Sequence, residues 1–540
     1  MTDRAPLPRR AFLRLAAGAG LALGGVALAG CEVARPTATP HPPGSPVASG
    51  RPSPVGAPAP AAPSVAATVP GPIATFRPVT VTENRREGHR GWDVGIGLPS
   101  SAEGYLVPAS VEPGERLALH ATAPVAFDVD WYRLGWYGGA GARRVHRSAG
   151  LPATPRGSVR TDATTGLVEA EWSEATAVDV PGSWPSGMYV AVLRPRDGSA
   201  PRAAPFVVRA SLRTMAPGVF LSAQTTWQAY NAWGGRSLYS YNSTGVPTPT
   251  GTAAAATVGF DRPYDWDGGL GFLRKWEVQF IRWLERTGRD VDYASDVDLQ
   301  TRPEILAGRR LAVQAGHAEY WSRPMRGAME AAVAAGMNAA FFSANEIYWQ
   351  VRLDSSPTGG DRRITCYKSA ERDPLTAAHP DLATCRWREA PVLQPEATFL
   401  GVMYGHVVRS PADWIVAQSG HWLYEGTGLR DGDALRSLVG QEYDAYFPEL
   451  APPGTVVVAR SPVRSIGRDP DGQGNVTSPP IHAAAIRDPA GGRGGVFAAG
   501  TFQWSWALDA YGQHTYGGRR TPLEPRVERM TANVLDRFSA

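Results

Sequence analysis

The pattern of apolar and polar positions changes near residue 210. Before that point, short segments such as 117–121, 127–131 and 188–193 fit a period of two, with turn residues between them. A period of two is typical of strands that have one buried face. We therefore predict an immunoglobulin-like β-sandwich over residues 75–210.

After residue 210, apolar runs alternate with stretches of helical periodicity. Residues 310–315 and 337–342 are apolar runs of strand length, and residues 323–335 between them have apolar side chains at helical spacing. A strand, a helix and a second strand in this order indicate neighbouring parallel strands. We predict a large doubly wound α/β domain over residues 211–540, so that the fold class is multidomain, all-β followed by α/β.

The first 74 residues follow neither pattern. Residues 9–13 form a twin-arginine motif, and the apolar segment after it ends in Leu28-Ala29-Gly30-Cys31, which resembles a bacterial lipobox. We predict an export signal over residues 1–31 and a lipid on Cys31 that anchors the protein outside the cytoplasm, to the bacterial cell membrane. Residues 32–74, rich in Pro and Ala, are expected to form a disordered tether. A plain signal peptide or an uncleaved anchor is the alternative.

Composition and charge narrow the range of partners. The formal net charge is +4 and 43% of the residues are hydrophobic, which is ordinary for a folded protein. No basic run is interleaved with aromatic residues, so we do not expect a nucleic-acid partner. The sequence contains two lysines, Lys275 and Lys368. All its other permanently charged basic side chains are arginines. A homo-oligomer is compatible with the sequence.

Two cysteines remain besides Cys31. In an exported protein, Cys366 and Cys385 are expected to form a disulfide that closes an insertion loop. Free or metal-binding thiols are the alternative.

The strongest indication of a functional site lies where the predicted strands end. His317 and Glu319 follow the run 310–315, and Asn345 follows the run 337–342. Open α/β sheets usually bind ligands at the carboxyl ends of their strands. The G-x-S-x-G, H-E-x-x-H and P-loop motifs are absent from the sequence, which argues against the enzyme classes that use them.

A third polar and aromatic segment, residues 225–241, follows the first strand of the same domain and contributes several tyrosines. Phenolate and carboxylate oxygens are hard ligands that suit a high-valent ion such as Fe(III). The structural alternative is that the aromatic residues close the core and that Glu319 caps a helix or forms an ion pair.

Five segments, 132–139, 226–241, 274–298, 316–321 and 344–352, together resemble the N,N-dimethylformamidase large (beta) subunit family, especially its C-terminal domain. The resemblance covers roughly residues 100–535. It implies an α/β domain that follows β-rich parts. It also implies an amidohydrolase that acts on a small amide and has a mononuclear iron held by two Tyr and one Glu.

Carried over residue by residue, the resemblance implies that Glu319, Tyr230 and Tyr239 hold the iron, here expected as Fe(III). The family's enzymes have a longer segment between the two tyrosines. Three further residues therefore compete with Tyr239 as the second Tyr ligand: Tyr241, Tyr264 and Tyr348.

The resemblance also suggests catalytic residues. His317 is the expected acid–base or orienting group beside Glu319, Asn345 a polar residue of the pocket, and Glu442 a further active-site acid. Tyr320 is expected to pack beside the site.

Two hypotheses about function follow. The first is a lipid-anchored metallohydrolase that cleaves an amide or a related C–N bond. The alternative is a non-catalytic surface lipoprotein that binds an envelope glycan or a partner protein, which the 17 Trp and 18 Tyr residues would also suit.

Overall fold

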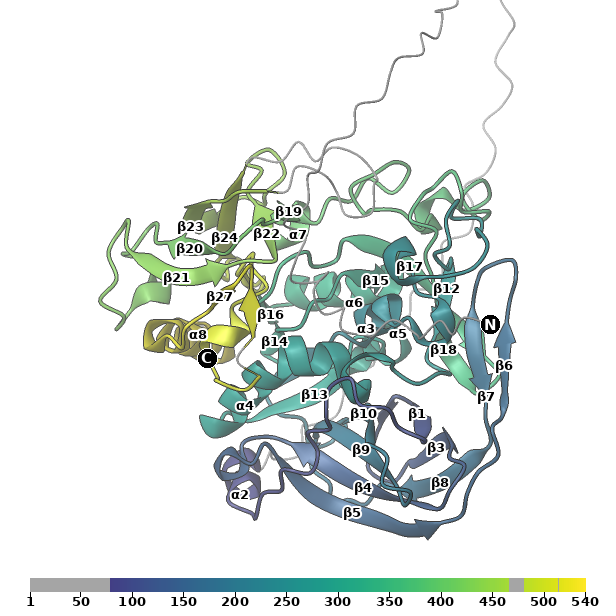
Figure 1. The fold of residues 1–540 in the computed structure, drawn as a ribbon. Coiled ribbons are helices and arrows are strands. Elements are labelled where there is room, and N and C mark those ends of the chain that lie inside the picture. Colours follow the sequence, from purple (N-terminus) through teal and green to yellow (C-terminus); the bar gives the residue numbers. More distant parts are fainter. Residues whose placement is uncertain (1–77, 466–479, 513) are drawn as a thin grey trace, which may run out of the picture. The chain divides into compact units, whose positions relative to one another are not determined.

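A computed structural model of the chain describes residues 78–465, 480–512 and 514–540. The predicted export signal, Cys31 and the tether lie outside these residues. The described part is rich in β-structure, which is arranged in several sheets, and contains few helices (Figure 1). None of the described helices has the length and apolar character needed to cross a membrane.

Residues 103–208 form two main sheets. A three-stranded sheet has the order β1-β3-β8, and a five-stranded sheet has the order β2-β10-β9-β4-β5. The strands are β1 (Glu103–Val107), β2 (Ser110–Val111), β3 (Arg116–Thr122), β4 (Phe127–Leu134), β5 (Ala142–Leu151), β8 (Glu174–Asp179), β9 (Gly187–Pro195) and β10 (Arg202–Val208). A separate pair consists of β6 (Ser158–Thr161) and β7 (Val168–Glu171).

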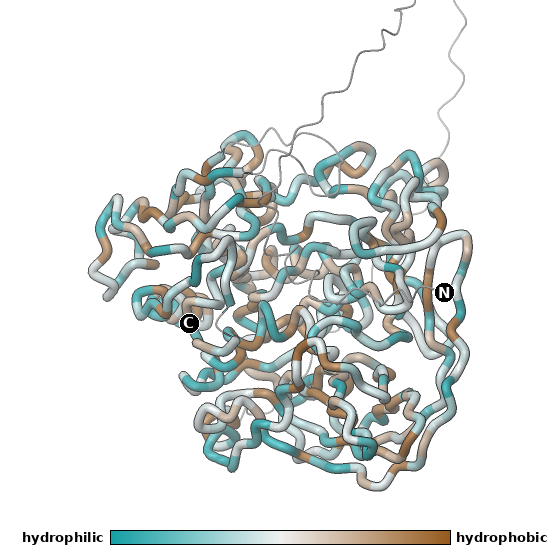
Figure 2. The backbone as a smooth tube through the Cα atoms, in the orientation of Figure 1, coloured by the Kyte–Doolittle hydropathy of each residue, from teal (hydrophilic) through white to brown (hydrophobic). Residues whose placement is uncertain are grey.

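Strands β4, β9 and β10 of the five-stranded sheet are buried on both faces, whereas the edge strand β5 is largely exposed. All eight residues of β4 are buried, although successive side chains of a strand point to opposite faces. Val129 and Trp131 belong to the core shared with the three-stranded sheet, whereas Tyr132 and Leu134 belong to the core of the following part of the chain. Strand β9 is mostly apolar, whereas β4 also carries buried polar side chains, among them Asp130 and Arg133, so hydrophobic and hydrophilic segments are mixed in this part of the chain (Figure 2).

A seven-stranded sheet forms the centre of the part of the chain after residue 210. Its order is β13-β11-β14-β16-β25-β24-β23, with parallel pairing from β13 to β25 and antiparallel pairing from β25 to β23. The strands are β11 (Gly218–Ser222), β13 (Val291–Ser295), β14 (Leu311–Gln314), β16 (Asn338–Phe341), β23 (Thr455–Pro462), β24 (Ile481–Arg487) and β25 (Val496–Ala498).

The remaining strands form smaller sheets. A four-stranded sheet has the order β12-β18-β17-β15, and three two-stranded sheets pair β19 with β22, β20 with β21, and β26 with β27. The strands are β12 (Thr257–Gly259), β15 (Tyr320–Ser322), β17 (Trp349–Ser356), β18 (Gly359–Thr365), β19 (Met403–Val407), β20 (Ala412–Ile415), β21 (Ala434–Val439), β22 (Glu442–Ala445), β26 (Thr515–Tyr516) and β27 (Arg519–Arg520).

The helices are mostly short. The α-helices are α2 (Thr80–Asn84), α3 (Gln224–Tyr230), α4 (Val278–Arg286), α5 (Asp298–Thr301), α6 (Arg323–Ala334), α7 (Ala397–Leu400) and α8 (Pro525–Ser539). A π-helical turn, η6 (Leu273–Glu277), runs directly into α4. The 3₁₀ turns are η2 (Tyr137–Gly139), η3 (Trp233–Gly235), η4 (Ser240–Asn242), η5 (Trp266–Gly269), η7 (Pro303–Leu306), η8 (Pro380–Leu382), η9 (Trp422–Tyr424) and η10 (Ser505–Ala507).

The two apolar runs of the sequence analysis become neighbouring parallel strands. Strand β14 pairs with β16 in parallel, with Leu311 opposite Asn338, and α6 lies between them in the sequence. Ser322 caps α6 by accepting a hydrogen bond from the backbone N–H of Met325. The finer assignments, an immunoglobulin-like sandwich and a doubly wound domain, stay predictions, as do the domain boundaries.

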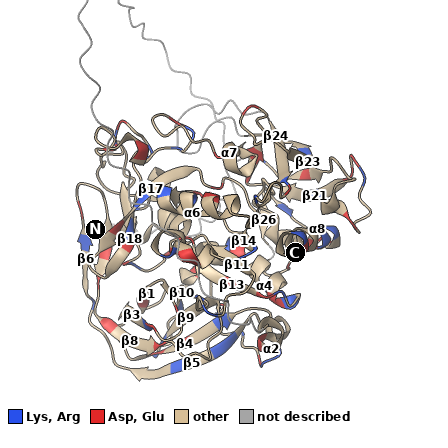
Figure 3. Cartoon of the chain, turned by 180° about the vertical axis from the view of Figure 1, so that it is seen from behind, with Lys and Arg blue, Asp and Glu red and all other residues tan. Residues whose placement is uncertain are grey.

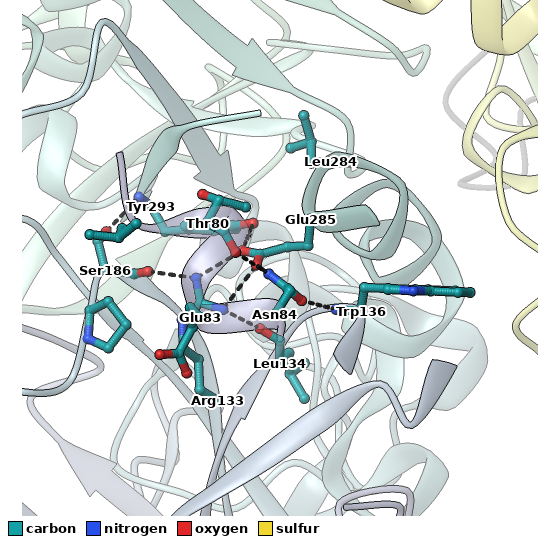
Figure 4. A network of polar contacts seen from close by, with 12 residues as sticks. Thr80, Glu83, Asn84, Arg133, Leu134, Trp136, Ser186, Leu284, Glu285 and Tyr293 are labelled. Atoms are coloured by element: carbon teal, nitrogen blue, oxygen red, sulfur yellow. Dashed lines mark hydrogen bonds and ion pairs between the residues drawn. The ribbon is translucent and has the colours of Figure 1, made fainter. Parts of the chain in front are cut away.

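A buried ion pair joins β4 to α4. Arg133 donates two hydrogen bonds to the carboxylate of Glu285, at 2.8 and 3.0 Å, and the two side chains are only 1% and 2% exposed. Asn84 of α2 donates to the same carboxylate, and its side-chain oxygen accepts a hydrogen bond from Trp136 N at 2.7 Å (Figure 4). We call these residues the junction. The aromatic segment 132–139 therefore packs on the following part of the chain.

Strand β5 shows how the surface charges are balanced. It carries several arginines, which are visible as blue segments in Figure 3. Arg143 pairs with Glu83 at 2.6 Å, and Arg147 pairs with Asp128 at 2.7 Å. The basic side chains of this strand are thus matched by neighbouring acids.

The predicted disulfide between Cys366 and Cys385 is wrong. Both thiols are free and buried, and each sulfur faces a different backbone carbonyl. The sulfur of Cys366 lies 3.9 Å from Gln350 O, and that of Cys385 lies 4.0 Å from Ala390 O. Burial raises the pKa of each thiol to about 12, so both are protonated at neutral pH.

Candidate functional site

The turn between β14 and β15 carries His317 and Glu319, and hydrogen bonds from other elements hold its backbone in place. Thr226 of α3 accepts the backbone N–H of Glu319 at 2.9 Å, and the carbonyl of Glu319 accepts the N–H of Trp349 at 2.9 Å. The N–H of Ala318 donates to Glu346 at 3.0 Å. Because these partners come from separate elements, the position of Glu319 depends on the assembled fold.

Two tyrosine hydroxyls meet the carboxylate of Glu319. Tyr230, the last residue of α3, donates to Glu319 Oε2 at 2.7 Å, and Tyr239, just before η4, lies 3.0 and 3.1 Å from its two oxygens. The two hydroxyls are 2.6 Å apart, and that of Tyr320 is 2.5 Å from Tyr239. We call the oxygens of Tyr230, Tyr239 and Glu319 the oxygen cluster. Tyr320, expected only to pack beside it, is hydrogen-bonded to it.

The environment of Glu319 favours its ionised form. Burial by itself raises the pKa of this carboxyl, but the contacts with His317, the charge of Lys368 and the hydrogen bond from Tyr230 outweigh that effect and lower it. The indole N–H of Trp349 also donates to Glu319, at 3.0 Å. Burial and the nearby carboxylate raise the pKa of Tyr230 well above its usual value, so its hydroxyl keeps its proton.

Tyr239 is the candidate second ligand that contacts both Tyr230 and Glu319. Its ring stacks on that of Tyr230 with centroids 4.2 Å apart, and the ammonium of Lys368 lies 3.3 Å from the centroid of the Tyr239 ring. Of the three rivals, Tyr241 packs on the ring of Tyr239 with centroids 5.5 Å apart and is 60% exposed. Tyr264 packs edge-on against Trp227, and Tyr348 packs against Trp349.

His317 lies against the oxygen cluster without being fixed by hydrogen bonds. Its Nε2 is 3.1 Å from Glu319 Oε2, within ion-pairing distance, but neither buried ring nitrogen makes a hydrogen bond of good geometry within the described part of the chain. The ring packs on Phe502 with centroids 4.3 Å apart. A buried imidazole with unsatisfied nitrogens is suited to binding or exchanging a proton with a ligand.

Asn345 and Glu442 form a second pair of contacting site residues. The amide of Asn345, after β16, donates to Glu442 Oε2 at 2.8 Å, and Glu442 begins β22. Asn345 has φ of 53° and the nearby Ile347 has φ of 54°, which places both in the left-handed region. Side chains held in this conformation carry backbone strain, and such strain is concentrated at functional sites. Asp444 accepts the N–H of Asn345 at 2.9 Å and helps to hold it there.

Further buried acids lie around the ends of the sheet strands. Glu277 accepts the N–H of Ala223 at 3.0 Å and the indole N–H of Trp227 at 3.1 Å. Burial raises the pKa of Glu277 to about 8, and it raises the pKa of both Asp296 and Asp444 to about 7. These carboxyls differ from Glu319, whose partners hold it ionised.

A recess opens beside Tyr230. It has an empty volume of about 280 Å³, including space that is continuous with solvent, and its walls include Tyr230, Trp266 and Phe272. The ring of Phe272 packs on that of Tyr230 at 4.9 Å and on that of Trp266 at 5.3 Å. Aromatic side chains thus separate the oxygen cluster from the surface.

The oxygen cluster suits a hard metal ion. Two phenol oxygens and a carboxylate lie within 2.6–3.1 Å of one another and are held together by protons that a cation could replace. Such oxygen donors match Fe(III). Among the residues that the structure describes, no three His, Cys, Asp or Glu side chains are grouped as metal ligands, so a site at this place depends on the tyrosines.

The structure brings the six predicted site residues together in two groups: the oxygen cluster with His317, and Asn345 with Glu442. Sequence reasoning missed Lys368 and Trp349 as neighbours of the oxygen cluster. Trp349 lies within the segment 344–352, but in the sequence alone it resembles a core residue. Lysine occurs at two positions of this sequence, and this rarity was the feature that could have singled out Lys368 as a site residue.

Comparison with known proteins identifies the family of the chain. No curated protein matches the chain. The model of the family described as N,N-dimethylformamidase beta subunit-like, C-terminal, matches residues 128–517, which include all six predicted site residues. The match covers well over half of the sequence. The chain belongs to this N,N-dimethylformamidase beta subunit-like family.

Proposed function

We propose that this protein is an iron-dependent amidohydrolase that cleaves a small amide or a related C–N bond. The observation that carries the proposal is the oxygen cluster, in which Tyr230, Tyr239 and Glu319 converge beside an aromatic recess. The family match supports the amide as the bond cleaved, because the family is named after an amidase.

In this proposal Tyr230, Tyr239 and Glu319 hold Fe(III). The ion would supply a Lewis acid that polarises the amide carbonyl. For Tyr230 to serve as a phenolate, its hydroxyl must lose the proton that it now shares with Glu319, whose ionised carboxylate is ready to accept a cation in its place. Trp349, which also donates to Glu319, keeps the carboxylate oriented.

The other predicted residues would move protons and stabilise charge. Glu442 takes a proton from the attacking water, and His317 delivers a proton to the departing nitrogen. The amide of Asn345, now bonded to Glu442 at 2.8 Å, donates to the oxyanion that develops on the carbonyl oxygen. The aromatic walls of the recess exclude bulk water, which strengthens these interactions.

We further propose that the enzyme acts outside the cytoplasm and is held at the bacterial cell membrane by a lipid on Cys31. The twin-arginine motif and the lipobox-like tetrapeptide support this location.

Metal analysis of the purified protein tests the proposal. We expect one iron per chain, and an absorption band in the visible range from phenolate-to-Fe(III) charge transfer that weakens in Tyr239→Phe. Glu319→Ala should lose the iron. The matched control Glu442→Gln should keep the iron while hydrolysis of formamides and acetamides falls at least ~100-fold, as is typical when a general base is removed. A protein without bound metal that cleaves no amide, or Glu319→Ala protein with full iron content, would contradict the proposal.

A further inference from the structure

Lys275 is one of the two lysines of this chain, and aromatic contacts connect each of the two with the candidate site. Lys368 lies over Tyr239, whereas Lys275 is on η6, the π-helical turn in front of α4. In this turn the backbone N–H of Val278 bonds to Leu273 O, five residues back, instead of four. π-Helical turns of this kind are frequent at functional sites. Lysine at these two places contrasts with the arginines that serve all other cationic positions.

Two chains of aromatic contacts connect Lys275 with the site. Its ammonium lies 5.4 Å from the ring of Trp266, which packs on Phe272, which packs on Tyr230 of the oxygen cluster. It also lies 4.6 Å from the ring of Trp276, which packs at 5.0 Å on Phe502, the residue against His317. Lys275 is therefore two rings away from both Tyr230 and His317.

The ammonium of Lys275 has no hydrogen bond or ion pair within the described residues, although the side chain is only partly exposed. Burial against the two indoles lowers its pKa to about 8, and the negative charges of Asp267 and Glu442 act in the opposite direction. At neutral pH most of the side chains are still charged. Glu442 also acts electrostatically on Tyr230, so the same carboxylate influences both the lysine and the oxygen cluster.

We propose that Lys275 binds a carboxylate of the substrate, so that the amide cleaved by this protein carries a negative charge on the part that extends away from the scissile bond. The inference rests on the proposed function for the position of the amide. A cation that has lost part of its hydration, and that makes no direct ion pair among the described residues, gains most from an anionic ligand. The indole faces of Trp266 and Trp276 attract the ammonium and hold it in place for that contact.

A purely structural role for Lys275 explains the observations less well. Cation–π contact alone would be served equally by arginine, which the chain uses at all its other cationic positions except Lys368. A structural lysine would usually also end in an ion pair, as Arg274 beside it does with Asp93 at 2.7 Å. Arg274 therefore shows what a structural cation on the same turn looks like, for comparison with Lys275.

The test compares amides that differ in charge and reach. The probes are formamido carboxylates of increasing chain length, from formamidoacetate to formamidohexanoate, and the neutral methyl ester of each one. Binding to the full-length, metal-loaded protein is measured by isothermal titration calorimetry, and cleavage by KM and kcat. We expect at least one chain length at which the acid binds about tenfold more tightly than its ester, the effect of one charge-assisted hydrogen bond.

Lys275→Met should remove that preference because it weakens the binding of the acid alone. The binding of the ester and kcat should stay unchanged. Lys275→Arg should keep part of it. Equal affinity for acid and ester at every length would overturn the inference even if all variants misfolded, because it is measured on the wild-type protein. Binding that depends on charge, without cleavage, would refute the proposed function and leave the role of Lys275 in binding the carboxylate standing. Cleavage without a preference for the charged amide would refute that role and leave the proposed function standing.

Discussion

Two buried carboxylates, Glu285 of the junction and Glu319 of the candidate site, face the same physical problem and meet different partners. Both are almost fully buried, and both accept a hydrogen bond from a tyrosine, Tyr293 at 3.0 Å for Glu285 and Tyr230 at 2.7 Å for Glu319. Glu285 also receives two hydrogen bonds from one guanidinium, that of Arg133. Among the described residues, no guanidinium bonds to Glu319; its remaining partners include a second phenol, an indole and an imidazole at 3.1 Å, and the charge of Lys368 acts on it.

The difference separates a structural carboxylate from one that can bind a ligand. The guanidinium of Arg133 stays charged at any physiological pH and matches the carboxylate at two points, so the junction is complete without a further ion. Phenol hydroxyls can lose their protons, and a cation can then bind all the oxygens that the protons now connect. Glu277 represents a third case, because its hydrogen-bond partners in the described part of the chain are uncharged and burial raises its pKa to about 8.

The largest effect on stability is expected at the junction. Arg133→Met leaves Glu285 buried without its counter-charge, which should reduce the free energy of unfolding by about 3–5 kcal/mol. Urea denaturation of the full chain, followed by tryptophan fluorescence, measures this change. The control is Arg133→Met/Glu285→Leu, which removes both charges and should recover most of the loss. A single variant that loses less than ~1 kcal/mol would place this pair among ordinary surface ion pairs.

An intermediate and pH-dependent effect is expected at Glu277. Its pKa is raised from 4.5 to about 8, so the folded protein holds a proton that the unfolded chain releases above pH 4.5. The resulting stability is fully present below about pH 4.5 and is lost as the pH rises towards 8, at about 1.4 kcal/mol per pH unit. Glu277→Gln should remove this slope. Denaturation of both proteins at pH 5, 6.5 and 8 tests it, and parallel stability curves would contradict it.

The smallest change in stability is expected at Asn345. Asn345→Gly loses the hydrogen bond to Glu442 but relieves the left-handed backbone, so the free energy of unfolding should change by less than about 1 kcal/mol. Asn345→Ala, the matched control, loses the same bond and keeps the strain. It should therefore be about 1 kcal/mol less stable than the glycine variant. Amide hydrolysis should fall in both variants. A glycine variant that is markedly less stable than the alanine variant would refute the strain argument.

Part of the fold could be predicted because local patterns determine it. The runs 310–315 and 337–342 contain little besides apolar residues, since strands of a central sheet are covered on both faces, and they became β14 and β16. The disulfide prediction failed because cysteine count and export context do not show where each sulfur points. Strand β4 could be recognised from its alternation, but the burial of its second face could not, since the elements that cover it come much later in the chain.

The candidate site shows the same division. The sequence by itself determined which strand ends carry His317, Glu319 and Asn345, because the order of apolar runs fixes where strands stop, and its motifs determined the family. Only the tertiary structure decided that the hydroxyls of Tyr230 and Tyr239 lie 2.6 Å apart on the carboxylate of Glu319, and that aromatic contacts connect both lysines with this place. Such distances depend on the packing of α3, β15 and η6 against one another, and no short segment of the chain contains that information.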